Sequence, residues 1–320
     1  MGAAAGGAAA ADAVGLLLGA GLDAVFGDPR RWHPVAGYGR FAAALERRTY
    51  RPTRAAGAVH VGLAVGVPVA AAAALGWATR RRPVWRTAVV AATTWAVLGG
   101  TSLRREAVAM AGSLEADDVT AARQRLSHLC GRDPAALGGD ELARATVESV
   151  AENTSDAVVA PLVWGAVAGL PGLVGYRAVN TLDAMVGHRS PRYQRYGWAA
   201  ARFDDAANLV PARVTAALTA LAAPAVGGTS RGALRAWQSD GGSHPSPNAG
   251  QCEAAMAGAL GVRLGGRNVY HGRVEHRPEL GDGAAPVAGD IRRAARLSAL
   301  VGTATAVLAA GVAIWRGVRR

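Results

Sequence analysis

The sequence predicts an all-α protein with several membrane-crossing helices. Just over half of its 320 residues are hydrophobic (51%), and only 18% are charged. The apolar residues gather in runs near 5–26, 56–78, 84–102, 157–175, 206–228 and 297–315. Each run is about long enough to cross a bilayer, which takes roughly 20 helical residues. We therefore expect one multi-pass integral membrane domain over residues 1–320, with helical and loop segments on its cytoplasmic side.

The runs differ in their interruptions. The first lacks the basic start of a cleaved signal peptide and is expected to be retained. The second and third are joined by a tight hairpin at 79–83, and the last, 297–315, is flanked by arginines. Pro211 and Arg213 indicate that the fifth lines something polar. The fourth carries Pro161, Gly165, Gly169, Pro171 and Gly172. That pattern favours a broken or re-entrant helix buried in protein.

Three hydrophilic stretches remain, at 27–55, 103–156 and 229–296. The second shows apolar residues at helical spacing, which predicts amphipathic helices at the membrane surface. The distribution of arginines does not fix the topology. If the chemistry uses cytoplasmic nucleotide, all three stretches face the cytoplasm, an inference from function rather than from charge.

All 35 basic residues are arginines, and the net charge is +12. The absence of lysine excludes a Walker P-loop, a Schiff base and any catalytic lysine. Arginines flank apolar runs rather than alternate with aromatic residues, so we expect a bilayer and anionic substrates as partners and no nucleic acid. Cys130 and Cys252 have no CxxC partner, which argues against a disulfide framework or a zinc site.

Acidic residues and amides concentrate between residues 148 and 208. Glu148, Glu152 and Asp156 are four apart and stack on one helix face, where like charges repel. The triplet alone also fits a solvated acidic face. The later recurrence of carboxylates and amides favours a site that holds Mg²⁺ and phosphates. The further members are Asp183, Asp204, Asp205, Asn153, Asn180 and Asn208.

Three arginines, Arg177, Arg202 and Arg213, lie within helical reach of these acids and amides. Each fits either a structural ion pair or a bidentate grip on a substrate phosphate.

Two further motifs combine polar groups with proline. Asp28 directly precedes Pro29, and His33 lies four residues after that proline. This arrangement fits a capped turn as well as a functional site. In the second motif, Asn248 is predicted to cap a helix whose free N–H groups bind phosphate. Capping would not explain why His244, Ser246 and Glu253 accompany it. The Gly/Arg segment that follows at 261–270 fits an anion-closing loop or a disordered surface.

Together these blocks resemble the membrane-bound adenosylcobinamide-phosphate synthases of cobalamin biosynthesis. The matching segments lie at 27–35, 148–156, 178–183, 201–213 and 244–253, in the order expected of the family. Departures occur at Ala157, Arg177, Ala184, Gln251 and Cys252. None of them removes a carboxylate or an amide.

The resemblance implies an ATP-dependent amide ligase that joins adenosylcobyric acid to aminopropanol phosphate or a related amino-alcohol phosphate. ATP and Mg²⁺ are implied as co-substrate and metal, and the cell membrane as the location. The implied catalytic residues are Glu152, Asp156, Asp183, Asp205 and His244. The implied metal ligands are Asp183, Asp204, Asp205 and Glu148. The implied substrate-binding residues are Arg177, Arg202, Arg213, Asn153, Asn180, Asn208, Ser246, Asn248, Glu253, Asp28 and His33.

Two other classes of protein share some of these features. A Mg²⁺-dependent intramembrane transferase acting on diphosphates or nucleotide-alcohols would also gather aspartates, and a transporter would also break its helices. The transferase usually shows two close aspartate pairs, and the transporter usually shows an internal repeat. A homo-oligomer, or a complex with other membrane enzymes of cobalamin assembly, is left open.

Overall fold

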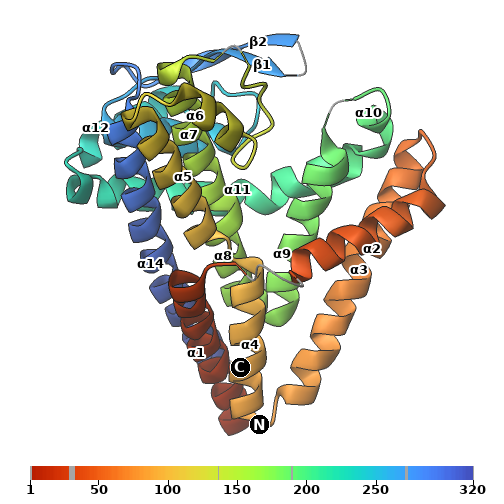
Figure 1. The fold of residues 1–320 in the computed structure, drawn as a ribbon. Coiled ribbons are helices and arrows are strands. Elements are labelled where there is room, and N and C mark those ends of the chain that lie inside the picture. The colour runs from red at the N-terminus through yellow and green to blue at the C-terminus, as the bar shows by residue number, and fades with distance from the viewer. Residues whose placement is uncertain (1, 29–32, 136, 189, 271–272, 320) are drawn as a thin grey trace. The chain divides into compact units, whose positions relative to one another are not determined.

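The computed structural model describes residues 2–28, 33–135, 137–188, 190–270 and 273–319. These residues are mainly helical, with a single antiparallel pair of strands among them (Figure 1). The elements are α1 (Gly2–Phe26), α2 (Pro34–Thr49), α3 (Arg54–Thr79), α4 (Pro83–Val97), α5 (Gly100–Glu115), α6 (Val119–Leu126), α7 (Gly139–Thr154), η1 (Ser155–Val159), α8 (Ala160–Ala168), α9 (Leu170–Leu182), η2 (Asp183–Gly187), α10 (Tyr193–Tyr196), α11 (Trp198–Ala222), η3 (Ala223–Val226), α12 (Ser230–Asp240), α13 (Ala249–Leu260), β1 (Leu264–Tyr270), β2 (Arg273–Leu280) and α14 (Ala288–Val318). The all-α prediction is confirmed.

Four helical segments in the described part of the chain are long and apolar enough to cross a membrane. They are Gly6–Phe26, Arg54–Thr79, Trp198–Val226 and Ala288–Val318. The chain is therefore a multi-pass helical membrane protein. The predicted run at 84–102 is corrected: α4 has 15 residues and ends at Val97, because Leu98 adopts an extended conformation (φ −78°, ψ 154°) before α5 begins. The uncharged stretch continues through Ser102, but the residues beyond Val97 are not part of that helix.

The predicted run at 157–175 is also not one continuous span. It comprises α8 and α9, which are separated at Gly169, where φ is +65°. This left-handed conformation favours glycine. The two helices pack against each other, and a methyl group added at Gly172 would overlap the carbonyl of Trp164. The prediction of a broken helix at this point is confirmed.

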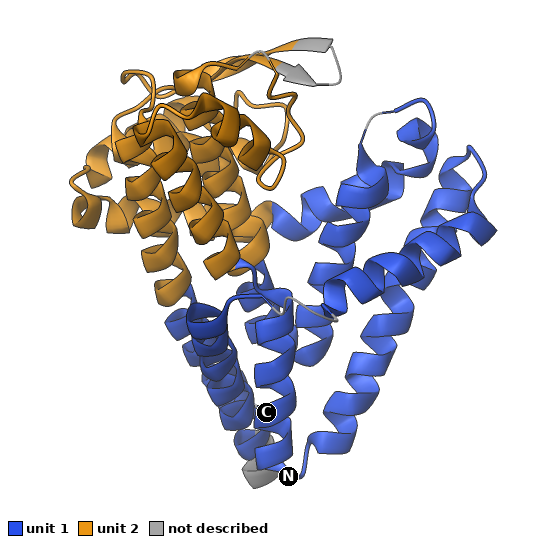
Figure 2. Cartoon of the chain, in the orientation of Figure 1, with its two compact units in different colours: residues 1–99, 160–208, 305–320 blue, residues 100–159, 209–304 orange. Residues whose placement is uncertain are grey.

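Contacts between Cα atoms group the chain into two compact units, each assembled from separated segments (Figure 2). Unit 1 contains residues 1–99, 160–208 and 305–320, and unit 2 contains residues 100–159 and 209–304. Because the units interleave along the sequence, they do not define successive sequence domains. The prediction of one polytopic domain stays a prediction.

Unit 2 has a continuous apolar core. The amphipathic helices predicted in 103–156 are present as α5, α6 and α7, and their predicted apolar positions Ala122 and Leu126 are fully buried. Segment 261–270, predicted to be a loop, instead contributes β1, which pairs with β2 and has an irregularity between Leu264 and Gly266. Strand pairing was hidden because this segment is rich in glycine and arginine, which are poor sheet indicators.

Unit 1 depends on close packing between α1 and α4. Gly15 and Gly19, four residues apart on one face of α1, lie against Val90 and Thr94 of α4. A side chain at either glycine would clash with those residues. Small residues at this spacing let helix backbones approach closely in a membrane, where van der Waals contact is the main source of helix association.

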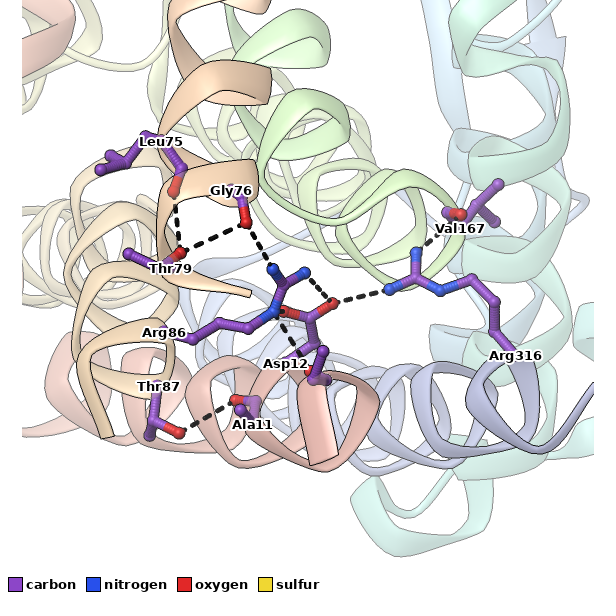
Figure 3. A network of polar contacts seen from close by, with 10 residues as sticks. Ala11, Asp12, Leu75, Gly76, Thr79, Arg86, Thr87, Val167 and Arg316 are labelled. Carbon is purple, nitrogen blue, oxygen red and sulfur yellow. Dashed lines mark hydrogen bonds and ion pairs between the residues drawn. The ribbon is translucent and has the colours of Figure 1, made fainter. Parts of the chain in front are cut away.

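An ion-pair network lies beside this contact (Figure 3). The buried carboxylate of Asp12 in α1 accepts hydrogen bonds from Arg86 of α4, at 2.7 and 2.9 Å, and from Arg316 of α14, at 2.7 Å. Arg86 also donates to the carbonyl of Gly76 in α3, and Arg316 donates to that of Val167 in α8. One carboxylate and two guanidinium groups thus connect five helices of unit 1.

Replacing Asp12 with alanine should strongly destabilise the protein. The change leaves two largely buried guanidinium groups without their shared carboxylate, and breaking a buried pair in this way typically costs about 3–5 kcal/mol. Denaturant unfolding of the detergent-solubilised protein would measure the loss in the free energy of unfolding. The matched control is Asp282→Ala, which removes an exposed carboxylate paired with Arg235 and should cost about 1 kcal/mol or less. Equal losses in the two variants would contradict a special role for the Asp12 network.

Candidate active site

The first group of predicted site residues lies within unit 1, and we call it the aspartate cluster: Asp183, Asp204, Asp205, Asn180 and Asn208. Asp204 accepts hydrogen bonds from the side-chain amides of Asn208, at 3.0 Å, and Asn180, at 3.5 Å. Asn208 is itself oriented by the hydroxyl of Tyr176, which donates to its Oδ1 at 2.9 Å. Helices α9 and α11 therefore supply a carboxylate held by two neutral amides.

Asp183 occupies the start of η2, a π-helical segment directly after α9. Burial, together with the negative charge of Asp205, raises the pKa of Asp183 to about 6, and nearby His188 acts in the opposite direction. The backbone must pass close to this carboxylate at Gly187, where an added methyl group would overlap Oδ1 of Asp183. Short π-helical segments often occur at functional sites. This one carries the carboxyl group of Asp183, whose pKa is raised in part by the negative charge of Asp205.

The three predicted phosphate-binding arginines have different surroundings. Arg177 donates to Oδ1 of Asn180 at 3.3 Å and lines an apolar pocket of about 170 Å³ with Tyr38 and Pro68. Arg202 forms an exposed pair with Asp205 at 3.5 Å. Arg213, in unit 2, is exposed and donates to the carbonyl of Leu209 in its own helix. Arg177 therefore both lines a pocket and contacts a member of the aspartate cluster.

The motif with Asp28 and His33 also belongs to unit 1. Helix α1 ends at Phe26, Gly27 has a φ of +70°, and Pro29 lies outside the described residues. His33 caps α2 by accepting a hydrogen bond from the Val35 N–H at Nδ1, and its Nε2 lies 4.0 Å from Asp28. Burial lowers the pKa of His33, Asp28 raises it, and the positive charge of Arg177 lowers it. The capping group is therefore His33 rather than the predicted aspartate, and it lies within electrostatic reach of Arg177.

The acidic helix face predicted at Glu148, Glu152 and Asp156 lies in unit 2, on α7 and the π-helical segment η1. Glu148 and Glu152 interact electrostatically with Glu253 of α13, and Glu152 and Asp156 with Cys252 beside it. The three acids therefore share the face directed toward α13, as their spacing predicted. Asn153 does not join them through its amide, which donates to Ser149 in the preceding turn.

Glu148 is buried in a set of donors that the sequence did not reveal. It forms ion pairs with Arg132 and Arg144, and its Oε1 accepts the backbone N–H of Gly265 at 2.7 Å. These contacts neutralise the carboxylate and fix α7 to the first residues of β1. They resemble the surroundings of a structural acid more than those of an open metal ligand.

The predicted helix entry at 244–253 is confirmed, with one difference. Asn248 occupies the N-cap position of α13, but the hydroxyl of Ser246 accepts the N–H groups of Asn248 and Ala249, at 3.3 and 3.2 Å. His244 is buried and lies 2.6 Å from a guanidinium nitrogen of Arg277 in β2. Arg277 and Arg132 were missed because single arginines in loops and strands carry no sequence pattern. Their only signal is contact across distant segments.

No three His, Cys, Asp or Glu side chains converge as a metal site in the described ranges. This does not conflict with Mg²⁺, which usually binds through one or two carboxylates with substrate phosphates and waters completing the octahedron. The aspartate cluster fits that donor set, because its amides supply hydrogen bonds but no positive charge to Asp204.

The fold and these clusters define a polytopic α-helical membrane protein with buried carboxylates and arginines. Residues 16–298 match the model of the CobD/Cbib protein family. The Cobalamin biosynthesis protein CobD of Mycobacterium tuberculosis (strain CDC 1551 / Oshkosh) is 59% identical over 299 residues, covering 93% of this chain and 94% of that protein. The protein of the same name from Geobacter metallireducens is 46% identical over 272 residues, covering 83% and 85%. No solved structure matches. The chain belongs to the CobD/Cbib family, which confirms the resemblance seen in its motifs.

The buried Glu253 should make stability depend on pH. Burial, reinforced by the charges of Glu148 and Glu152, raises its pKa well above the usual value. Between its unfolded pKa, near 4.3, and its folded pKa, the folded state binds more protons than the unfolded state, so stability falls as pH rises. In Glu253→Gln this contribution is absent. Both melting temperatures would be measured in detergent. As the pH rises from 5 to 8, the melting temperature of the variant should rise relative to that of the wild type. If the difference in melting temperature stayed constant across that pH range, Glu253 would not be a buried acid with a raised pKa.

Proposed function

We propose that this protein is an adenosylcobinamide-phosphate synthase, an ATP-dependent ligase of cobalamin biosynthesis. It would join the free carboxylate of adenosylcobyric acid to the amine of aminopropanol phosphate or a related amino-alcohol phosphate. Membership of the CobD/Cbib family supports the pathway. The observation that carries the reaction class is the aspartate cluster, in which the carboxylate of Asp204 is held by two amides and one of these, Asn180, also contacts Arg177. This combination suits anionic phosphates bound together with a divalent cation.

The proposed reaction needs an activated carboxylate, because a free carboxylate is a poor acyl donor. Transfer of the ATP γ-phosphoryl group would give an acyl phosphate, and attack by the amine would form the amide and release phosphate. One or two of the carboxylates of Asp183, Asp204 and Asp205 would hold Mg²⁺, which when bound supplies positive charge to the phosphoryl oxygens. Arg177 would orient an anionic substrate, and the amides of Asn180 and Asn208 would hold Asp204 in place.

The attacking amine must lose its proton before or during attack. Asp183 belongs to both predicted sets, and its pKa of about 6 suits a group that accepts a proton near neutral pH. A nearby cation would lower that pKa and favour its role as a ligand instead.

We place the reaction at the cytoplasmic side of the cell membrane, because ATP is a cytoplasmic co-substrate. The four apolar helices support the membrane setting.

Purified protein incubated with ATP, Mg²⁺, adenosylcobyric acid and amino-alcohol phosphate should produce the amide, together with ADP and phosphate. Mass spectrometry would identify the corrinoid product, and a coupled assay would measure ATP consumption. Omission of the amino-alcohol phosphate is the matched control. Release of pyrophosphate from an alcohol-linked substrate would favour the transferase alternative, and substrate accumulation in vesicles without amide formation would favour a transporter.

Asp183→Asn and Asp205→Asn should each lower turnover by about 100-fold or more, because an amide supplies neither the negative charge nor the basicity of a carboxylate. Gly187→Ala should give a similar loss, since the new methyl group displaces the Asp183 carboxylate. Gly112→Ala is the control, because a side chain there meets nothing within 4 Å. Steady-state kinetics and a melting curve for each folded variant would test this. Wild-type turnover in the Asp183 and Asp205 variants would place the chemistry elsewhere.

A further inference from the structure

The network around Asp12 (Figure 3) fixes the level of three tryptophans in unit 1. They are Trp77, Trp85 and Trp315, and each is the chain neighbour of a network residue: Gly76 in α3, Arg86 in α4 and Arg316 in α14, respectively. Because hydrogen bonds hold these network residues together, the tryptophans lie at one end of unit 1, where α1 begins, α3 ends, α4 begins and α14 ends (Figure 1). They are 68%, 64% and 55% exposed. Three large aromatic side chains therefore face outward at this end.

This end of unit 1 has the features of a boundary between membrane and water. Trp77 lies in the last turn of the candidate span Arg54–Thr79, and Trp315 lies in the last turn of Ala288–Val318. An indole combines a large apolar ring with one N–H donor, which is why tryptophan is enriched where hydrocarbon meets the lipid headgroups. Exposed tryptophans at the ends of two spans therefore indicate the depth at which the headgroups begin.

Arginines lie just beyond these tryptophans. Arg80, Arg81 and Arg82 form the connection between α3 and α4, and Arg319 follows α14; all four are exposed. The guanidinium carbon of Arg80 lies 4.0 Å from the ring centre of Trp77, and that of Arg319 lies 4.0 Å from the ring centre of Trp315. A guanidinium over an indole face is attracted by the ring. The stacked rings thus hold positive charge at the headgroup level.

The polypeptide supplies little negative charge at this end. Residues 47–105, 157–182 and 291–320 contain no aspartate or glutamate. The acid of the network, Asp12, already accepts hydrogen bonds from both Arg86 and Arg316. The positive charge of the four exposed arginines is therefore left for anions outside the protein.

We propose that these three tryptophans and four arginines form a surface that binds the headgroups of acidic phospholipids. The exposed guanidinium groups donate hydrogen bonds to lipid phosphates, and the indoles lie beside the first carbons of the acyl chains. Basic residues close to a bilayer are attracted by the negative surface potential that anionic lipids create. The position at the ends of two spans favours a lipid over a soluble phosphate. This site does not rest on the proposed ligase reaction.

Nanodiscs of phosphatidylcholine, alone or mixed with phosphatidylglycerol, provide the test with the full-length protein. A ligand that binds the folded state and not the unfolded state raises the melting temperature. Phosphatidylglycerol should therefore raise the melting temperature of the wild type. The double variant Arg81→Gln/Arg82→Gln should lose about half of that rise or more, because it lacks two of the four positive charges that attract the lipid.

The matched control removes two exposed arginines that already have acidic partners. It is Arg235→Gln/Arg263→Gln, in which the partners are Asp282 and Glu279. This control should keep the full rise in melting temperature. The proposal would be overturned by an undiminished rise in Arg81→Gln/Arg82→Gln, by no rise in the wild type, or by an equal loss in the control.

Two further measurements use the wild-type protein and so decide the question even if the double variant does not fold. The rise caused by phosphatidylglycerol should shrink at high salt, since screening weakens the attraction between exposed charges. A rise that is independent of salt would contradict a headgroup site. Inorganic phosphate added to phosphatidylcholine nanodiscs should not reproduce the rise. An equal rise with inorganic phosphate would assign the surface to soluble anions and overturn its assignment to lipids.

Discussion

A carboxylate buried among apolar helices must obtain hydrogen bonds or positive charge from the protein, and the type of partner separates the acids of this chain. Asp12 and Glu148 are each met by two arginines, which neutralise them and tie helices together. Asp204 is met by two amides, which satisfy its oxygens without supplying charge. Neutralised acids are structural components. An acid without an arginine partner in such surroundings is a candidate for binding a cation or a proton.

The backbone reinforces this distinction. Two π-helical segments, η1 and η2, contain Asp156 and Asp183, both predicted catalytic residues. A π-helical turn widens the helix and changes the direction of the side chains that follow, an arrangement found often at functional sites. At η2 the turn also requires Gly187, because any larger residue would occupy the volume of the Asp183 carboxylate. The irregular helical turns of this chain therefore coincide with two of its predicted catalytic acids.

Much of this arrangement could be predicted from sequence because it depends on short-range periodicity. A spacing of four placed Glu148, Glu152 and Asp156 on one helix face, and glycine with proline marked the break between α8 and α9. The partners of Glu148 could not be predicted, because Arg132 approaches it from a loop and Gly265 from strand β1. The end of α4 was missed for a related reason: the uncharged stretch continues through Ser102, whereas the helix ends at Val97. Tertiary contacts and backbone torsion carry information that composition lacks.

The Asp12 network also has a consequence for biosynthesis. Asp12 and Arg86 are 74 residues apart in the chain, but Arg316 follows Asp12 by 304 residues. At about 5–20 residues per second, a ribosome needs roughly 15–60 s between making Asp12 and making Arg316. During that interval Arg86, in the early α1–α4 pair, is the partner of Asp12 in this network that has already been made. The charge network of the nascent membrane protein is therefore incomplete during this interval, while the chain is in the translocation machinery or the bilayer. Helix α14 then joins helices that were synthesised earlier.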